Sequence, residues 1–277
     1  MKILIRGAGD IATGIALRLY RAGMQVVMTD LPAPTAIRRT VCFSQAIILG
    51  ETTVEDVTAR RAETPDQAEA LLAQGLIPVL ADADCTCRTH LWPDALVDAI
   101  LAKRNLGTKM DDAPIVVGIG PGFTAGEDCH AVVETMRGHT LGRVIYRGSA
   151  LPNTNIPGLI GGYAGERVLR APAEGIFCQK LEIGAVVRAG DIAGEVAGQP
   201  MRCTIDGVLR GILADGTPVF RGMKAGDVDP RCKPEYCTTA SDKALAVGGG
   251  VLEAVLHLHH RNPPAGKQSQ FTGGAIL

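Results

Sequence analysis

Apolar positions near the start of the chain predict a strand, a helix and a second strand. Residues 3–5 and 26–28 are short apolar runs of the kind that form buried strands. Between them, Ile11, Ile15 and Leu19 recur at every fourth residue, which places them on one narrow face of a helix. The pattern therefore indicates a helix that packs on one face of a parallel sheet.

A glycine-rich turn joins this first strand to the helix. Residues 6–14 read RGAGDIATG, and an acid ends the second strand. In dinucleotide-binding turns of this kind, one glycine permits the tight turn, the next admits a pyrophosphate, and the helix N-terminus faces the anion. We therefore expect a nucleotide to contact Gly7, Gly9, Asp10, Ala12 and Asp30. The alternative is structural, with glycines that pack a strand–helix corner beside a solvated carboxylate.

Further apolar runs extend the predicted sheet. Residues 76–81 and 115–119 are predicted strands, and Thr64 is the expected N-cap of a helix that precedes the first of them. A second glycine-rich loop, GPGFTAG at residues 120–126, follows directly. Because ligands bind at the carboxyl ends of parallel strands, we expect the two loops to share one cleft, in which Gly120 and Gly122 contact the ligand.

Two more segments present basic groups. Arg38 and Arg39 lie either near a phosphate of the ligand or on a solvated helix face. The apolar runs 131–133 and 144–146 predict a hairpin whose turn carries the sequence ETMRGH. That turn presents Arg137 and His139 to an anionic ligand, and the alternative is a polar turn in which His139 caps a backbone carbonyl.

An internal repeat marks the second part of the chain. The sequences EGI and DGV begin 32 residues apart, at Glu174 and Asp206, and the glycines that follow keep the same offset. Two units of short strands can bury together a core that neither buries alone. The pattern resembles the barrel-sandwich hybrid of biotinyl and lipoyl carrier domains. Residues 197–201 contain no lysine to modify, so we interpret this domain as a scaffold or docking surface.

These patterns predict an α/β fold with a Rossmann-like nucleotide-binding domain at residues 1–165. A small all-β barrel-sandwich hybrid (biotinyl/lipoyl-like) domain follows at 166–240, and Ser241 caps a C-terminal helix at 241–261. Each glycine of residues 248–250 weakens that helix by about 1 kcal/mol relative to alanine, so we expect close packing or a break there. Residues 262–277 are polar and rich in glycine and proline, and are predicted to be a mobile tail.

Composition and charge narrow the class of function. The 277 residues carry a formal net charge of −1, which gives no indication of binding to nucleic acid or to an anionic membrane. We expect no transmembrane segment and no signal peptide, since a strand begins directly after Lys2. The protein is therefore expected in the cytoplasm, where its eight cysteines remain thiols.

Candidates for catalytic chemistry are few. Cys85 and Cys87 lie within a cluster of residue types that bind metals, namely Asp82, Asp84 and His90. Their spacing differs from that of structural zinc sites, which also need a second pair of ligands, so we predict no metal site. Ordinary thiols are one interpretation, and a reactive Cys85 is the other. The candidate catalytic residues are Cys85, Asp128 and His139.

Four motifs, taken in order, resemble the selenium-dependent molybdenum hydroxylase system accessory protein family. They are RGAGDIATG at residues 6–14, GPGFTAG at 120–126, ETMRGH at 134–139 and SDKA at 241–244. The resemblance covers nearly the whole chain, up to about Leu256. It implies a factor that assists the maturation of a molybdenum hydroxylase, at the step where labile selenium or sulfur reaches the molybdenum cofactor. It identifies no catalytic residue.

We therefore expect a cytoplasmic accessory protein that binds a nucleotide or the dinucleotide form of the molybdenum cofactor. Its partners would be a molybdenum hydroxylase or other maturation factors. One alternative is an NAD(P)-dependent oxidoreductase, which needs an acid or base near the nicotinamide. Another is a docking scaffold that binds a nucleotide without chemistry. The sequence leaves open the ligand, any catalysed reaction and the formation of a homo-oligomer.

Overall fold

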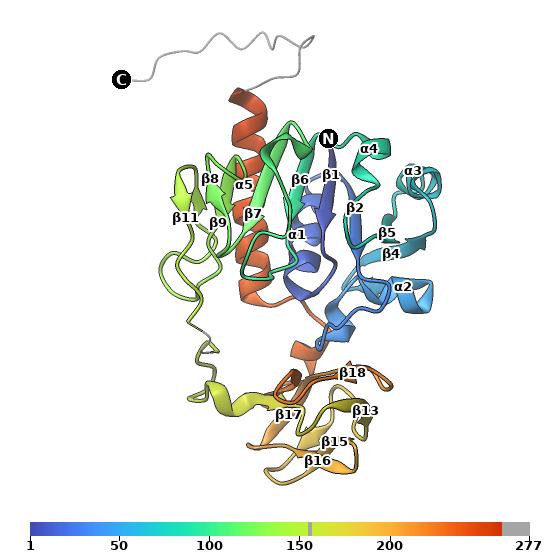
Figure 1. Cartoon of the computed structure of the whole chain (residues 1–277), viewed down its shortest axis with the longest axis vertical. Helices are drawn as coiled ribbons and strands as arrows, with labels where there is room; N and C mark the ends of the chain where they lie inside the picture. Colours follow the sequence, from blue (N-terminus) through green and yellow to red (C-terminus); the bar gives the residue numbers. More distant parts are fainter. Residues whose placement is uncertain (155–156, 262–277) are drawn as a thin grey trace.

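The apolar runs of the N-terminal part form one large sheet (Figure 1). The computed structural model describes residues 1–154 and 157–261, and within them this sheet has nine strands in the order β10-β9-β7-β6-β1-β2-β5-β4-β3. The strands are β1 (Lys2–Arg6), β2 (Gln25–Asp30), β3 (Glu51–Val54), β4 (Val57–Ala62), β5 (Ile77–Ala81), β6 (Ala95–Asp98), β7 (Ile115–Ile119), β9 (Ala131–Val133) and β10 (Val144–Ile145).

The strands from β4 to β9 in this order run parallel, whereas the edge strands β3 and β10 are antiparallel to their neighbours. The predicted hairpin is confirmed by the pairing of β9 with β10. Two loop segments, β8 (Thr124–Ala125) and β11 (Gly148–Ser149), form a separate two-stranded sheet. Because the central strands are parallel, the loops that follow β1, β2, β6, β7 and β9 all lie at one edge of the sheet.

Helices cover both faces of the large sheet. They are α1 (Asp10–Arg21), α2 (Gln45–Leu49), α3 (Pro65–Ala73), α4 (Arg88–Leu91) and α5 (Asp242–Arg261), with 3-10 turns η1 (Arg39–Val41), η2 (Met110–Asp112), η3 (Gly165–Arg167) and η4 (Pro234–Cys237). Helices α1, α2 and α5 share a core with Ile3 and Ile5 of β1, while α3 and α4 share the opposite core with Leu4. Thr64 accepts a hydrogen bond from the Gln67 amide and so caps α3, as predicted.

Helix α5 crosses α1 at a separation that only small residues allow. A Cβ atom on Gly14 would lie 2.5 Å from the Cβ of Ala244, and one on Gly248 would lie 2.8 Å from the Gly14 carbonyl oxygen. Gly250 packs as closely against the carbonyl oxygen of Gly142. The expectation of close packing is thus confirmed for Gly248 and Gly250, and α5 continues through both without a break.

A small lobe lies below the large sheet in Figure 1 and consists of short antiparallel strands. Its elements are β12 (Val168–Arg170), β13 (Gly175–Gln179), β14 (Val186–Val187), β15 (Ile192–Val196), β16 (Gln199–Arg202), β17 (Gly207–Ile212), β18 (Pro218–Val219) and β19 (Lys224–Asp229). The repeat is visible in their pairing, since β13 pairs with β18 of the second unit and β17 with β14 of the first. This exchange buries one shared core around Phe177 and Leu209.

The small lobe docks on the segment that follows β2. The amide of Ile212 donates to the Ile37 carbonyl at 2.8 Å, and Arg39 donates back to the Ile212 carbonyl at 2.9 Å. Gly211 faces the same segment, and a Cβ there would lie 3.1 Å from the Ile37 carbonyl oxygen. Arg38 donates to the carbonyl of Tyr236 at 2.9 Å, which ties the return segment before α5 to the same place.

The predicted fold class, a Rossmann-like domain followed by a barrel-sandwich hybrid domain and a separate C-terminal helix, is wrong. The large sheet is mixed, and in the described residues no α-helix connects β6 to β7 or β7 to β9. Helix α5 instead packs on α1 and so belongs to the lobe that contains the large sheet. The strands of the small lobe form two open four-stranded sheets, β12-β19-β17-β14 and β16-β15-β13-β18. The chain is a mixed α/β protein with a large central sheet.

Two further expectations concern the ends and surfaces of the fold. The predicted mobile tail, residues 262–277, lies outside the described residues. Among the helices of residues 1–154 and 157–261, none combines the length and the apolar character needed to cross a membrane.

The crossing of α1 and α5 can be tested with two glycines that are adjacent in α5. Gly248→Ala should lower the free energy of unfolding by about 1–3 kcal/mol, because the new methyl group would lie 2.8 Å from the Gly14 carbonyl oxygen of α1. The control is Gly249→Ala, where a Cβ meets no atom within 4 Å. Alanine should leave stability unchanged there, or raise it by up to about 1 kcal/mol. Urea unfolding measures both variants, and equal stabilities would contradict the close crossing.

Candidate functional site

The turn between β1 and α1 has the backbone geometry that its glycines suggest. Gly7 has a φ of +106°, and a Cβ there would lie 3.0 Å from the backbone of Ala99 in the loop after β6. Gly9 is the N-cap of α1, and a Cβ there would meet no atom within 4 Å. Gly7 is therefore required by the turn itself. Gly9 instead leaves open space directly before the N–H groups of the helix N-terminus.

Asp30 braces this turn from the end of β2. Its carboxylate accepts hydrogen bonds from the amides of Ala8 and Leu31, both at 2.8 Å. Burial raises the pKa of Asp30, and the two amide hydrogen bonds oppose that rise. Ala12 is buried beneath the turn, where its small side chain keeps the helix close to the sheet.

Two cavities meet at the turn. The edge cavity, of about 540 Å³, lies along the ends of β1, β2 and β6 and is lined by Asp30. The interlobe cavity, of about 860 Å³, lies between the large sheet and the small lobe. The same four residues line both cavities where they adjoin: Gly9, Asp10, Ile11 and Ala36. One elongated ligand therefore has room to lie across the glycine-rich turn and to occupy both.

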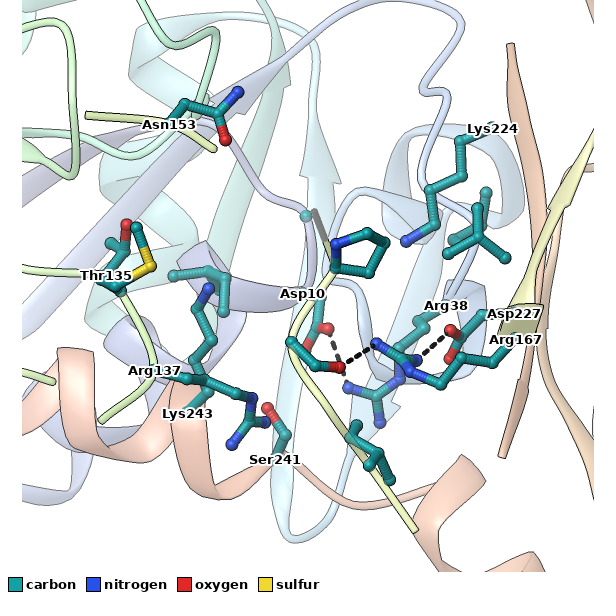
Figure 2. A pocket seen from close by; sticks show the side chains of 18 of the residues that line it. Asp10, Arg38, Thr135, Arg137, Asn153, Arg167, Lys224, Asp227, Ser241 and Lys243 are labelled. Atoms are coloured by element: carbon teal, nitrogen blue, oxygen red, sulfur yellow. Dashed lines mark hydrogen bonds and ion pairs between the residues drawn. The ribbon is translucent and has the colours of Figure 1, made fainter. Parts of the chain in front are cut away.

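The interlobe cavity is strongly basic. In the part of the chain that the structure describes, two acidic side chains, Asp10 and Asp227, line it together with eight basic ones. The basic residues are Arg38, Lys103, Arg137, Arg167, Arg170, Arg210, Lys224 and Lys243. Figure 2 shows that Arg137 and Lys243 lie on one side of the cavity, and that Lys224 and Arg167 lie on the other. This arrangement favours an anionic ligand.

Most of the arginines already have carboxylate partners. Arg38 donates to Asp10 at 2.8 Å, and Arg167 and Arg210 both donate to the buried Asp227. Arg210 also reaches Asp229 at 2.9 Å. These pairs hold the walls of the cavity in place, because each buried charge has a partner of opposite sign.

The lysines differ from the arginines in this respect. Among the described residues, Lys103, Lys224 and Lys243 form no ion pair, although all three line the cavity. Lys103 and Lys224 are exposed and Lys243 is half-buried, and partial desolvation lowers the pKa of Lys224. Desolvation also lowers the pKa of Lys103, and it lowers the pKa of Lys243 together with the charges of Lys103 and Arg137. The cavity therefore holds positive charge that the protein does not neutralise.

Three polar atoms at the cavity are buried without a hydrogen-bond partner in the described structure. They are Oδ1 of Asp10, Nε of Arg38 and Nε of Arg167. Buried polar groups are rarely left unsatisfied in proteins. All three atoms belong to the charged side chains that form the cavity walls through their ion pairs.

The four sequence motifs converge here. Glu134 is buried, and its carboxylate accepts from the amides of Thr135, Met136 and Leu151, which shapes the loop that carries Arg137. Arg137 forms a bidentate ion pair with Asp242 at 2.7 and 2.9 Å. The third and fourth motifs thus contact each other, and the fourth packs on the first through Gly14 and Ala244.

The second glycine-rich loop also reaches the site, although its glycines do not line it. Pro121 lines the interlobe cavity together with Gly9, so the two loops share one cleft as expected. A Cβ on Gly120 would lie 2.6 Å from the Thr135 hydroxyl oxygen, and one on Gly122 would lie 2.6 Å from the Arg104 backbone. Both glycines therefore allow close packing of the loop. Neither lines the interlobe or the edge cavity.

The candidate catalytic residues line neither the interlobe nor the edge cavity. Asp128 accepts from the Thr124 amide at 2.8 Å and so orders the second glycine-rich loop, and His139 is exposed. Cys85 is buried, has a φ of +56° and lines a cavity of about 210 Å³ that shares Arg6, Asp84 and Leu106 with the edge cavity. Hydrogen bonds from Cys87 lower the pKa of Cys85, contrary to the rise expected from nearby carboxylates alone. In residues 1–154 and 157–261, no cluster of residues is suited to hold a metal ion.

Sequence reasoning missed several residues that line the interlobe cavity. Lys103, Arg167 and Lys224 belong to no motif, and no spacing in the sequence distinguishes them from other surface cations. Lys243 lies within the SDKA motif, which was the one available signal. Arg38 was considered for a phosphate, and it lines the cavity while it pairs with Asp10.

Comparison with known proteins identifies one strong relative. No family model matches the chain. The uncharacterized protein YqeB of Escherichia coli strain K12 is 50% identical over 266 residues, which are 96% of this chain and 49% of that protein. The chain therefore spans about half the length of the relative it matches.

Solved structures show only weak likeness. A succinylglutamate desuccinylase/aspartoacylase from Rhodobacter sphaeroides is 26% identical over 23% of this chain and 22% of that chain, with a TM-score of 0.20. The product-bound ectoine utilization protein EutE (DoeB) from Ruegeria pomeroyi is 13% identical over 74% and 57%, with a TM-score of 0.23. An aspartoacylase family protein from Mesorhizobium loti is 11% identical over 82% and 84%, with a TM-score of 0.26. Scores this low support no inference about this chain.

The ion pair between Arg137 and Asp242 predicts a distinctive pH dependence. The pair lowers the pKa of Asp242 from 3.8 to about 2, so its stabilisation is present above about pH 4 and is lost as the pH falls toward 2. Asp242→Asn should lower the free energy of unfolding at pH 6 by about 1 kcal/mol, a value reduced for the 69% exposure of the Asp242 side chain.

Chemical denaturation at several pH values measures this difference, which should vanish near pH 2. The control is Glu127→Gln, because the exposed Glu127 forms no ion pair among the described residues. A constant difference between wild type and Asp242→Asn over the whole pH range would show that the pair does not stabilise the fold.

Proposed function

We propose that the protein binds a nucleotide or a dinucleotide across the glycine-rich turn. The observation that carries the proposal is the junction of the two cavities at Gly9 and Asp10, with a basic cavity on one side and Asp30 on the other. The anionic part of the ligand would lie at the N-terminus of α1 and in the interlobe cavity. The nucleoside would lie in the edge cavity, where Asp30 has acceptor capacity for a ribose hydroxyl.

We further propose that this ligand serves the maturation of a molybdenum hydroxylase, with the dinucleotide form of the molybdenum cofactor as the main candidate. The four motifs that resemble the accessory family support this proposal. All four meet at the interlobe cavity, where one ligand would contact them. The partners would be the hydroxylase or its other maturation factors, in the cytoplasm.

A role in binding and delivery fits the geometry better than a dehydrogenase role does. A dehydrogenase places an acid or base beside the reacting carbon, within hydrogen-bond reach. The sequence offers His139, Asp128 and Lys109 for that task, and none of them lines the interlobe or the edge cavity. The NAD(P)-dependent oxidoreductase therefore remains the weaker proposal.

Nucleotide binding can be tested at Gly9. Gly9→Val should weaken binding of the ligand by at least about tenfold, because the new side chain occupies the open space before the helix N-terminus. The fold should persist, since Gly9 has an ordinary φ of −74°. Calorimetry with NAD(H), NADP(H), CTP, GTP and the dinucleotide form of the molybdenum cofactor gives the measurement.

The control for this variant is Gly165→Val, at an equally open position in η3 that lines neither cavity. Gly165→Val should bind as the wild type does. The proposal fails if the unaltered protein binds none of these compounds, or if both variants bind equally well.

The role in maturation can be tested in the native host. Deletion of the gene should lower the active fraction of a molybdenum hydroxylase while its polypeptide level stays the same, because the enzyme would lack only its finished cofactor. Complementation with wild type should restore activity, and complementation with Gly9→Val should not. Normal hydroxylase activity after deletion would rule out this role.

A further inference from the structure

Three lysines that are distant in the sequence face the interlobe cavity. Lys103 lies in the loop after β6, Lys243 is in the first turn of α5, and Lys224 begins β19 of the small lobe. The loop at Lys103 is strained, with a φ of +65° at this residue, which is uncommon for a side chain other than glycine. The fold thus brings basic groups from three segments, and from both lobes, to one cavity.

Most of the neighbouring arginines are not free to bind an anion in place of the lysines. Arg38, Arg167 and Arg210 are committed to Asp10, Asp227 and Asp229 by the ion pairs that hold the cavity walls. Arg137 is committed to Asp242 in the same way. The charge without a carboxylate partner is therefore that of the three lysines and of Arg170, which donates to the Gly222 carbonyl, and an anionic ligand would neutralise it.

An ammonium group suits a phosphate oxygen, because it donates up to three hydrogen bonds and carries a compact charge. Arg38 and Arg167 line the same cavity and form ion pairs with Asp10 and Asp227. Both arginines are more than nine-tenths buried, at 7% exposure each. The three lysines thus line a cavity whose walls are fixed by buried ion pairs.

We propose that Lys103, Lys224 and Lys243 form a subsite for one phosphate-class oxyanion that is held from both lobes at once. The subsite deepens the proposed function, since the oxyanion would be the anionic end of the ligand that lies on the glycine-rich turn. One bound oxyanion would join the small lobe to the large sheet through direct hydrogen bonds. The small lobe would then form part of the binding site, in addition to docking on the lobe that contains the large sheet.

Inorganic pyrophosphate is the probe, because it carries the oxyanion without a nucleoside. Calorimetry at about 150 mM salt should give one pyrophosphate per chain for the wild type. Lys224→Gln in the small lobe and Lys243→Gln in α5 should each weaken that single event by at least about tenfold, the effect of losing one charge-assisted hydrogen bond. The control is Lys180→Gln, which removes an exposed small-lobe lysine that pairs with Glu195 outside the cavity.

A second readout separates binding from folding. Because the lysines are unpaired in the free protein, Lys224→Gln and Lys243→Gln should unfold at the same temperature as the wild type, or higher, when no anion is present. A marked loss of thermal stability in both would assign these lysines a structural role and overturn the subsite.

Stoichiometry and the Gly9→Val variant distinguish the remaining outcomes. Two pyrophosphates per chain, with one lost in each lysine variant, would mean separate sites on the two lobes and would overturn the bridge. If nucleotides bind but pyrophosphate affinity is unchanged in both variants, the subsite is wrong and the proposed function stands. A last outcome is that no nucleotide binds, while pyrophosphate binds to wild type and to Gly9→Val and its affinity falls in the lysine variants. In that case the subsite stands and the proposed function is wrong.

Discussion

The close crossing of α1 and α5 is the constraint on which the candidate site depends. The first helix begins at the glycine-rich turn, and the last begins with Asp242 and Lys243, more than two hundred residues later. Gly14 and Gly248 let the two helix backbones approach almost to contact, so these two N-termini lie at the same cavity. Larger side chains at the crossing would separate the helices, and the cavity would lose one of its walls.

The small lobe provides the opposite wall, and its attachment is polar. Backbone hydrogen bonds between Ile37 and Ile212 fix its position, and Arg38 joins that segment to Asp10 at the start of α1. The same arginine therefore connects the glycine-rich turn to the junction of the lobes. A change in the position of the small lobe would therefore move one wall of the interlobe cavity.

Electrostatics explains why this cavity is a binding site and not only a gap between lobes. The arginines of the cavity wall, such as Arg210, have buried carboxylate partners, whereas Lys103, Lys224 and Lys243 form no ion pair among the described residues. Lys103 and Lys224 are exposed and Lys243 is half-buried, and their unneutralised charge gives the cavity a positive potential that favours an anionic ligand.

Local features of the fold could be predicted from the sequence, whereas long-range ones could not. The strand, turn and helix around Gly7 and Gly9 follow from short apolar runs and from backbone freedom, which neighbouring residues determine. The same holds for the cap at Thr64 and for the hairpin of β9 and β10. The predicted fold class was wrong because apolar periodicity does not show that the connections after β6 and β7 lack helices. It also does not show that α5 returns to pack on α1.

The candidate site was predicted in part for the same reason. Gly9, Asp10 and Asp30 were expected at the strand ends and lie at the two cavities. The lysines could not be identified, because the sequence does not show whether a lysine side chain faces a cavity or the bulk solvent. Only tertiary packing brings Lys103, Lys224 and Lys243 together and deprives them of counter-ions.

If the interlobe and edge cavities hold one phosphorylated nucleotide ligand, protein purified gently from its native host should carry it. Native mass spectrometry before and after denaturation tests this most directly, because the ligand is released and weighed without any assumption about its identity. The predicted result is a single compound per chain that contains at least one phosphate group and a nucleoside. A released compound without phosphate would contradict the account, as would a protein that is empty and takes up no nucleotide from a cell extract.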